Sequence, residues 1–314
     1  MKKNLFFIAL GATIMAVGCS KENGVEVNGI EIPKAVIENF EKQYPNASNV
    51  KWSKRSSYII AQFDLATSKA AAAHIPANTV WYNDAANCIM EELDIPVSKL
   101  PQPIQDALKA SKYATCEVDD IDVISRDGFT KVYVIEVEGK TADGSNVDID
   151  LYFSEDGILL REVPDSEDDD DSNEYDSLIS EVDMSRFDSF IKERFGDYRL
   201  VEADVEDDGS IEIEIVASID EKQVKLDVVF GRNGKFIYDV YEIEFINAPD
   251  AIKKYIGEKY ADQDVDEIDI ARTADGKTLY VFEIELEVDG NEVEKDIILQ
   301  IDEKGAVVEV TDIK

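Results

Sequence analysis

The chain contains few of the residues from which active sites and metal centres are built. Its 314 residues include a single histidine, His74, and only three cysteines. Zinc sites usually recruit several histidine and cysteine ligands, so this set does not suffice for one. His74 follows the alanine run Ala70–Ala73, with no serine or cysteine in a nucleophile motif beside it, which favours an exposed loop histidine over a catalytic base. We therefore expect no catalytic residues and no enzymatic activity.

The glycines do not form a phosphate-binding loop. They occur singly at predicted hairpin turns, which argues against nucleotide chemistry. The 69 acidic residues are so many that neighbouring carboxylates will arise by chance, and a glycosidase would also need a pocket that short strands with tight turns do not build. A hydrolase is the least favoured of the functions we consider.

Basic residues are scarce as well. The chain has 32 lysines and arginines against 69 acids and a formal charge of −37, and removal of residues 1–18, which hold two lysines and no acids, changes this to −39. Nucleic acid binding requires a basic surface, so it is excluded. A charged face that binds membranes is also unlikely on these grounds, and an N-terminal lipid is the only membrane contact that we expect.

Long hydrophobic runs are absent except at the N-terminus. A 13-residue apolar run, Leu5–Val17, follows Lys2 and Lys3, and such a run is too short to span roughly 30 Å of hydrocarbon. We predict a signal peptide over residues 1–18 that resembles those of bacterial lipoproteins, with Cys19 as the lipid-modified residue. A buried first helix with an incidental cysteine is the alternative.

Two details bear on this signal. Ala16 stands where leucine is usual in lipoprotein signals, and Ser20–Glu22 resembles a surface-export signal of lipoproteins in some Gram-negative lineages. We expect an outer-membrane lipoprotein with a tether over residues 19–27, and its exposure to the periplasm or to the cell exterior stays open. Cys88 and Cys116 could form a disulfide in such a compartment or remain two buried thiols, and the sequence does not decide between them.

A unit of one amphipathic helix followed by strands recurs four times. The helices end at corresponding aromatic residues, spaced by 69, 82 and 65 residues: Tyr44, Tyr113, Phe195 and Tyr260. A repeat period of this size is typical of stacked or paired supersecondary units. Each helix starts with suitable residues, namely Pro33, Pro103, Asp183 or Ser185, and Pro249.

Strict alternation of apolar and polar residues follows each helix, as in Ile211–Ile215 and Tyr280–Leu286. This period predicts strands with one buried face and one solvated face. Turn residues such as Asp156-Gly157 and Asn233-Gly234 precede the last strand of a unit and indicate hairpins. We predict an α+β fold of four repeats, each with a helix packed on a three- or four-stranded antiparallel sheet.

An acidic segment divides the repeats into two pairs, since residues 165–176 carry eight acids in twelve positions. The spacing lacks the glycine and the final glutamate of an EF-hand, so we predict a solvated linker over 164–177. The predicted domains are residues 28–163, with repeats 28–98 and 99–163, and residues 178–314, with repeats 178–245 and 246–314.

The chain contains several short motifs of one kind of domain: Ile32-Pro33, Phe40, Tyr44-Pro45-Asn46-Ala47, Val50-Lys51-Trp52, Leu100-Pro101 and Leu151–Gly157. Together they resemble the beta-lactamase-inhibitor-like, PepSY-like domains of secreted bacterial proteins. The resemblance is strongest over residues 30–163 and looser over 178–314, where the Tyr-Pro-Asn-Ala and Trp signatures are absent. It implies two tandem domains and, from the better-known inhibitor, a sheet surface that grips a partner protein.

The register of the predicted strands places aromatic residues on the side of the sheet away from the helix. If Ile59, Ala61 and Phe63 face the helix, the candidate binding residues on the opposite, uncovered side are Tyr58, Ile60, Trp81 and Tyr152. Exposed aromatic residues anchor protein interfaces at low entropic cost. Packing between repeats could cover them instead. Trp52 falls in the inward register, and we interpret it as a core residue.

The two halves differ in charge at these outward positions. Residues 28–98 carry a net charge of −2, whereas residues 176–314 carry −22. The outward positions of the second half are Glu212, Glu214, Glu283 and Glu285. Neighbouring carboxylates repel, and a calcium ion or a basic partner would relieve the repulsion. A merely solvated acidic face is the alternative.

From these features we expect a non-catalytic envelope lipoprotein that binds a protein or peptide through an open sheet face, and inhibitor-like binding is one form that this could take. The alternative is a structural or Ca²⁺-buffering envelope protein. No other cofactor is expected, and the sequence does not identify the partner.

Overall fold

The computed structural model describes residues 24–27, 29–55, 57–65, 78–141, 144–164, 175, 178–180, 182–263, 265–288, 291–302 and 304–310, without the side chains of 285–294. The predicted signal peptide, Cys19, His74 and most of the predicted linker lie outside these residues. The chain divides into two compact units, one up to Glu91 and one from Glu92 onward, and each is described by itself.

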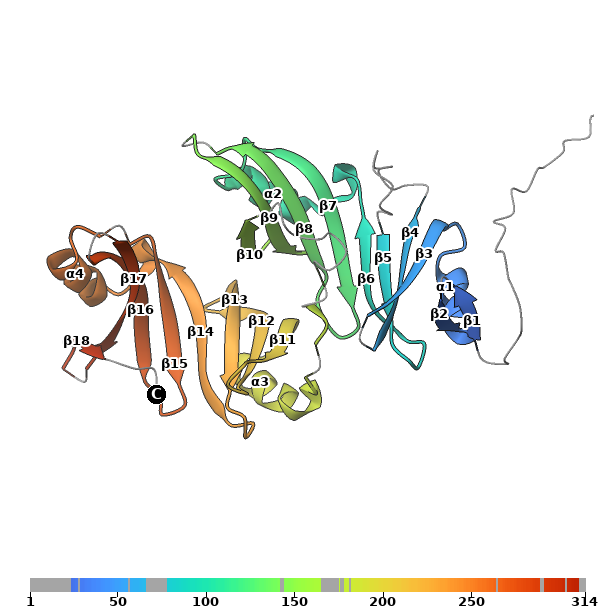
Figure 1. Cartoon of the computed structure of the whole chain (residues 1–314). Helices are drawn as coiled ribbons and strands as arrows, with labels where there is room; N and C mark the ends of the chain where they lie inside the picture. Colours follow the sequence, from blue (N-terminus) through green and yellow to red (C-terminus); the bar gives the residue numbers. More distant parts are fainter. Residues whose placement is uncertain are drawn as a thin grey trace, which may run out of the picture. The chain divides into compact units, whose positions relative to one another are not determined.

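Four helices are present in the described residues (Figure 1). They are α1 (Lys34–Gln43), α2 (Gln102–Ala110), α3 (Asp188–Phe195) and α4 (Asp250–Lys259). Short 3₁₀ turns occupy Val97–Lys99 (η1), Met184–Arg186 (η3) and Phe245–Asn247 (η4).

The strands form two large antiparallel sheets and one small one. The first large sheet has the order β10-β9-β8-β7-β6-β5-β4-β3, and the second runs from β11 to β18 in sequence order. The small sheet pairs β1 (Gly24–Val27) with β2 (Ile30–Pro33). The first large sheet consists of β3 (Ser48–Arg55), β4 (Tyr58–Asp64), β5 (Asn78–Tyr82), β6 (Cys88–Asp94), β7 (Glu117–Arg126), β8 (Val132–Lys140), β9 (Asn146–Ser154) and β10 (Leu159–Pro164). The second consists of β11 (Tyr198–Val205), β12 (Ile211–Ile219), β13 (Lys222–Phe230), β14 (Phe236–Glu244), β15 (Glu267–Thr273), β16 (Thr278–Val288), β17 (Asn291–Ile301) and β18 (Val307–Val310).

The size of the sheets differs from the prediction. Instead of one sheet of three or four strands for each repeat, two consecutive repeats share a sheet of eight strands. In the second sheet, β14 of the third repeat pairs with β15 of the fourth, so that Tyr241 lies opposite Ile270. The edge of a small sheet carries unpaired backbone amides and carbonyls, and fusion of neighbouring edges satisfies them.

The helices begin where the sequence predicts. α1 and α4 start directly after Pro33 and Pro249, and Pro103 lies in the first turn of α2. Proline is tolerated there because its missing amide would have no partner within the helix. The Asp183 side chain accepts a hydrogen bond from the Ser185 amide and so caps η3, which leads into α3. α2 ends at Ala110, three residues before Tyr113.

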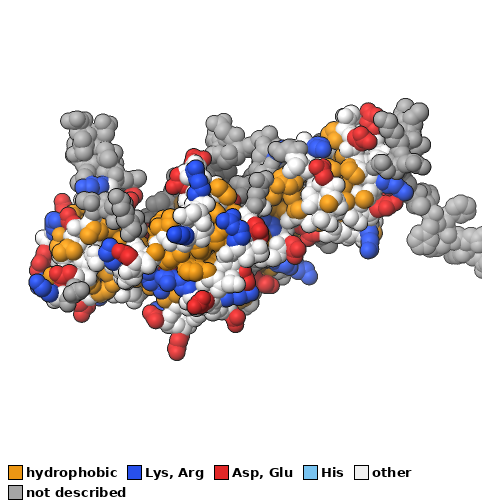
Figure 2. Space-filling view, turned by 90° about the horizontal axis from the view of Figure 1, so that it is seen from below, with side chains coloured by type: hydrophobic (Ala, Val, Ile, Leu, Met, Phe, Trp, Pro, Cys, Tyr) orange, Lys and Arg blue, Asp and Glu red, His pale blue; other side chains and the backbone are white. Residues whose placement is uncertain are grey.

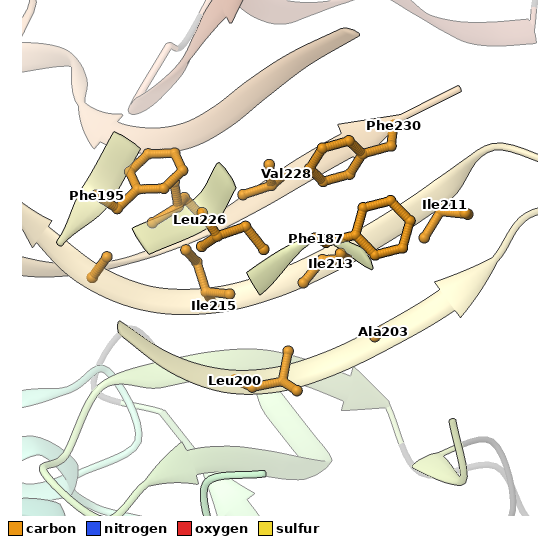
Figure 3. Packing of buried hydrophobic residues seen from close by; sticks show 12 residues of the cluster. Phe187, Phe195, Leu200, Ala203, Ile211, Ile213, Ile215, Leu226, Val228 and Phe230 are labelled. Atoms are coloured by element: carbon orange, nitrogen blue, oxygen red, sulfur yellow. The ribbon is translucent and has the colours of Figure 1, made fainter. Parts of the chain in front are cut away.

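Each helix covers one side of its sheet. Around α3, Phe187 and Phe195 pack against inward residues of β12 and β13, among them Ile213 and Val228 (Figure 3). Separate clusters form around α2 and α4. In the first repeat Phe40 of α1 meets Phe63 and Trp52 edge-on, with ring centroids 5.1 and 5.2 Å away, so Trp52 faces the helix as predicted. Within the described residues, no helix covers the opposite sides of the sheets.

Candidate functional site

The helix-free side of the second sheet carries a group of half-buried carboxylates. Along β12 and β13, Ile211, Ile213, Leu226 and Val228 pack toward α3, and the residues between them point the other way. We call the half-buried acids on that side the acidic face. It consists of Glu202, Asp204, Glu212, Glu214 and Asp227.

The strand register sets these carboxylates against one another. Glu202 lies opposite Glu214, and Asp204 lies opposite Glu212. On the next strand Asp227 is the partner of Glu214. Side chains at directly opposed positions of an antiparallel pair are close neighbours, and like charges there are destabilising. The acidic face therefore carries electrostatic repulsion between neighbouring carboxylates.

The protonation of the acidic face reflects this crowding. Burial and the neighbouring Glu202 carboxylate raise the pKa of Asp204 to about 7. Burial, with Glu212 nearby, raises the pKa of Asp227 to about 6. Burial likewise raises the pKa values of Glu212 and Glu214 above their usual range. Ionised carboxylates on this face are consequently held at a cost that a cationic ligand would reduce.

Two cations offset part of the charge. Lys225 forms an ion pair with Glu214 at 3.1 Å, and Arg161 forms one with Glu202 at 3.3 Å. Asp227 nevertheless retains a buried carboxylate oxygen, Oδ1, without a hydrogen-bond partner. A buried oxygen atom without a hydrogen-bond partner lowers the stability of the fold, and it can accept a hydrogen bond from a donor group of a ligand.

The carboxylates named from the sequence occupy the expected side. Glu212 and Glu214 belong to the acidic face, and Glu283 is exposed on β16, opposite Asp296. The side chain of Glu285 lies outside the described part of the chain. Within the described part, the acidic side chains that approach one another closely enough to share one ion are Asp119, Glu136 and Glu138, within 4.8 Å. The binding of a metal by Glu212, Glu214, Glu283 or Glu285 stays a prediction.

The predicted aromatic binding surface is not open. Ile60, Trp81 and Tyr152 are only 3%, 2% and 5% exposed, and Tyr58 is half-buried. Ile60 and Trp81 are register partners, so the two large side chains cover each other. Tyr152 lies beneath the Arg161 guanidinium, 4.2 Å from its ring centroid, beside Leu178 and Val201. The expectation of exposure for these three residues is therefore wrong.

The helix-end aromatics have a role that the sequence analysis missed. In three repeats the tyrosine hydroxyl donates a hydrogen bond to a glutamate on a later strand of the same repeat. These pairs are Tyr44 with Glu91 at 2.9 Å, Tyr113 with Glu162 at 2.8 Å and Tyr260 with Glu309 at 2.6 Å. The nearly constant separation along the chain was the available signal. Phe195 of the third repeat has no hydroxyl.

The third repeat has a buried ion cluster instead. Asp239 is fully buried and accepts hydrogen bonds from Arg194 Nε at 2.6 Å and Arg272 Nε at 2.5 Å. Because Arg194 belongs to α3 and Arg272 to β15, the cluster ties the third repeat to the fourth. It lies on the helix-covered side of the sheet.

Neither described cysteine forms a disulfide. Burial and the Glu91 carboxylate raise the pKa of the Cys88 thiol to about 12. A thiol with such a pKa is protonated near neutral pH and is a poor nucleophile. Among the described helices, none is both long and apolar enough to cross a membrane.

Charge is distributed unevenly over the surface. On the face seen in Figure 2, basic and acidic side chains lie next to each other around several hydrophobic areas. The acidic face differs, because Arg161 and Lys225 pair with only two of its five carboxylates.

Comparisons with known proteins place these features in a family. The family model described as "Putative beta-lactamase-inhibitor-like, PepSY-like" matches residues 68–161 and 216–309, together more than half of the chain. Among curated proteins, none matches.

Solved structures show partial similarity. A BLIP-like protein from Bacteroides fragilis is 27% identical, with 45% of this chain and 93% of that chain covered and a TM-score of 0.36. A DUF2874 family protein from Bacteroides ovatus is 25% identical over 43% of this chain and 91% of that chain, with a TM-score of 0.35. By its two matched regions, the chain belongs to the beta-lactamase-inhibitor-like, PepSY-like family.

Proposed function

We propose that this protein is a non-catalytic cell-envelope lipoprotein that binds a basic protein or peptide through the acidic face. The observation that carries the proposal is the register of β11, β12 and β13, which sets Glu202 against Glu214 and Asp204 against Glu212. Repulsion of this kind lowers stability, and proteins retain such local conflicts at functional sites. Lysine or arginine side chains of a partner would supply the missing positive charge.

The rest of the site supports binding rather than catalysis. In the described residues, the half-buried Cys88 is a protonated thiol, and the carboxylates lie on a sheet surface rather than in a deep pocket. A sheet surface without a helix is suited to hold an extended partner area. Inhibition of an enzyme would be one form of such binding.

The location in the envelope follows from the N-terminal sequence. Lys2, Lys3 and the apolar run Leu5–Val17 precede Cys19, which we propose as the lipid attachment site in the outer membrane. Labelled fatty acid should be incorporated into the full-length protein in cells and not into Cys19→Ala. Equal incorporation into the wild-type protein and into Cys19→Ala would refute this site. In a separate experiment, proteolysis of intact cells would decide which side of the membrane the protein faces.

A titration with charged peptides tests the partner class. Oligolysine should bind the wild-type protein, and because the contact is ionic its affinity should fall as salt is added. Oligoglutamate of equal length is the matched control and should not bind. Absence of oligolysine binding at low salt would refute the proposal.

Calcium is the second candidate ligand, favoured by the carboxylates of Asp119, Glu136 and Glu138, whose oxygen atoms lie within 4.8 Å of one another. Calcium prefers carboxylate oxygens. Calorimetry with millimolar Ca²⁺ should then give heat and a higher melting temperature, both reduced in Asp119→Asn. If Ca²⁺ gives no heat and no thermal shift, calcium binding is refuted and the basic partner is the sole proposal.

A further inference from the structure

A buried arginine joins the two large sheets within the unit that starts at Glu92. Arg126, the last residue of β7 in the first sheet, is only 8% exposed. Its Nη1 donates a hydrogen bond to the Leu178 carbonyl oxygen at 2.6 Å, and its Nη2 donates to the carbonyl oxygen of Val201 in β11 of the second sheet. The guanidinium lies 4.5 Å from the ring centroid of Phe129.

Other polar contacts cross the same boundary. The Thr130 amide donates to the Leu200 carbonyl oxygen at 2.6 Å. Arg161 of β10 pairs with Glu202 of β11 at 3.3 Å. Arg199 pairs with Asp156 at 2.6 Å. These contacts come from three separate segments of the first sheet, so the boundary is fixed at several points rather than at one.

Residues at the end of the acidic segment and just after it also pack into this boundary. Tyr175 is buried, and its hydroxyl donates to Asp122 Oδ2 at 3.2 Å. Leu178 is buried, and the Ser180 hydroxyl donates to the carbonyl oxygen of Ala203. Separation of the two sheets would expose Leu178 and Val201 to water, which is unfavourable.

The helix-free sides of both sheets meet here. A small cavity of about 10 Å³ is lined by Arg126, Tyr152 and Arg161 from the first sheet and by Glu202 and Glu214 from the second. Near this boundary, the helix-free side of each sheet carries acidic residues. On the first sheet Glu136 and Asp150 are register partners, and on the second sheet the acidic face begins at Glu202.

We propose that this junction joins strands β7–β10 of the first sheet and the second sheet into one rigid body, so that the helix-free sides of these two parts form a single docking surface for a basic protein. The docking surface rests on the proposed function, whereas the junction rests on the contacts alone. A partner that spans both sides would touch carboxylates from two different sheets. Neither sheet carries this surface by itself.

Hydrogen exchange at the Thr130 amide tests the junction in the full chain. This amide lies in the short turn between β7 and β8, and its bond to Leu200 should slow exchange by at least about tenfold relative to an unstructured peptide. In Arg126→Ala the protection should be lost, while the amides of Ile213 and Val228 stay protected. The exposed Arg232→Ala is the matched control and should leave Thr130 protected.

The outcomes are distinct. Unprotected Thr130 in the wild-type protein would overturn the junction, and unchanged protection in Arg126→Ala would overturn the role of Arg126. If amides throughout Arg126→Ala lose their protection from exchange, the experiment is repeated with Arg126→Lys. Lysine keeps the positive charge but lacks the two-pronged donor geometry of arginine. For the docking surface, Asp150→Asn should weaken oligolysine binding as much as Glu214→Gln does. A protected Thr130 without oligolysine binding would refute the proposed function while the junction stands.

Discussion

The two sides of the second sheet differ in how their side chains interact: apolar residues pack closely on one side, and carboxylates oppose one another on the other. On the side covered by α3, Ile213, Ile215 and Val228 pack into a closed core, and even the charged Asp239 is matched by two arginines. On the helix-free side the same strands set carboxylates such as Asp204 and Glu212 against each other. One set of strands thus presents a side that stabilises the fold and a side that reduces its stability.

This contrast separates structural from functional residues. Alternation along a strand assigns neighbouring residues to different sides, so Ile213 and Glu214 differ by one position and have opposite effects. We therefore expect substitutions on the covered side to cost stability, and neutralisation on the helix-free side to preserve or raise stability while binding is lost.

The largest effect is expected at the buried ion cluster. Asp239→Ala removes the acceptor for Arg194 and Arg272 and leaves two cations in a mostly buried site. Loss of one partner from a buried ion cluster typically costs about 3–5 kcal/mol, measurable by urea denaturation. Asp262→Ala, at an exposed position, should change stability by less than about 0.5 kcal/mol. Equal effects would remove the contrast between covered and exposed acids.

The pH dependence of stability should report the helix-free side. Folding raises the pKa values of Asp204 to about 7 and of Asp227 to about 6, so the folded chain binds more protons than the unfolded chain between about pH 4 and pH 7. Stability should rise as the pH falls from 8 to 5, seen as a higher melting temperature. Asp204→Asn with Asp227→Asn should flatten this profile. A wild-type profile that falls toward pH 5 would contradict it.

A moderate effect is expected at the helix ends. Tyr44→Phe keeps the buried ring and removes the hydrogen bond to Glu91, which should cost about 1 kcal/mol. A double-mutant cycle with Glu91→Gln isolates the pair. The cycle extends the comparison to the first sheet, and a coupling energy near zero would show that this contact does not stabilise the covered side.

The smallest effect has the opposite sign. Asp204→Asn relieves the repulsion from Glu202 and Glu212 and should raise stability by about 0.2–1 kcal/mol at pH 8. Glu193→Gln on the exposed surface of α3 is the control and should be nearly neutral. Destabilisation by Asp204→Asn would mean that this carboxylate serves the fold.

The features that depend on neighbours along the chain could be predicted from the sequence. The prolines before α1 and α4 and the alternation of Ile211–Ile215 identified the helices, the strands and the direction of Glu212 and Glu214. These signals act over a few residues, and the physics that produces them is equally local.

The features that depend on distant segments could not be predicted from the sequence. Tyr152 is buried by Arg161 and by Leu178, which comes from beyond the acidic segment, and no period in the sequence reports that contact. The joining of repeats into larger sheets and the burial of Arg126 have the same origin. The pairs of Tyr44 with Glu91 and of Tyr260 with Glu309 were accessible in principle, because they recur at similar spacing.

The most direct test compares oligolysine binding by two variants that each lose three negative charges. The first changes the acidic face: Asp204→Asn, Glu212→Gln and Asp227→Asn. The second changes exposed acids elsewhere on the same half of the chain: Glu193→Gln, Glu258→Gln and Asp262→Asn. The account predicts that affinity falls at least about tenfold, or 1.4 kcal/mol, in the first variant only. Equal losses in both variants would show that oligolysine senses net charge alone and would contradict a specific role for the helix-free side.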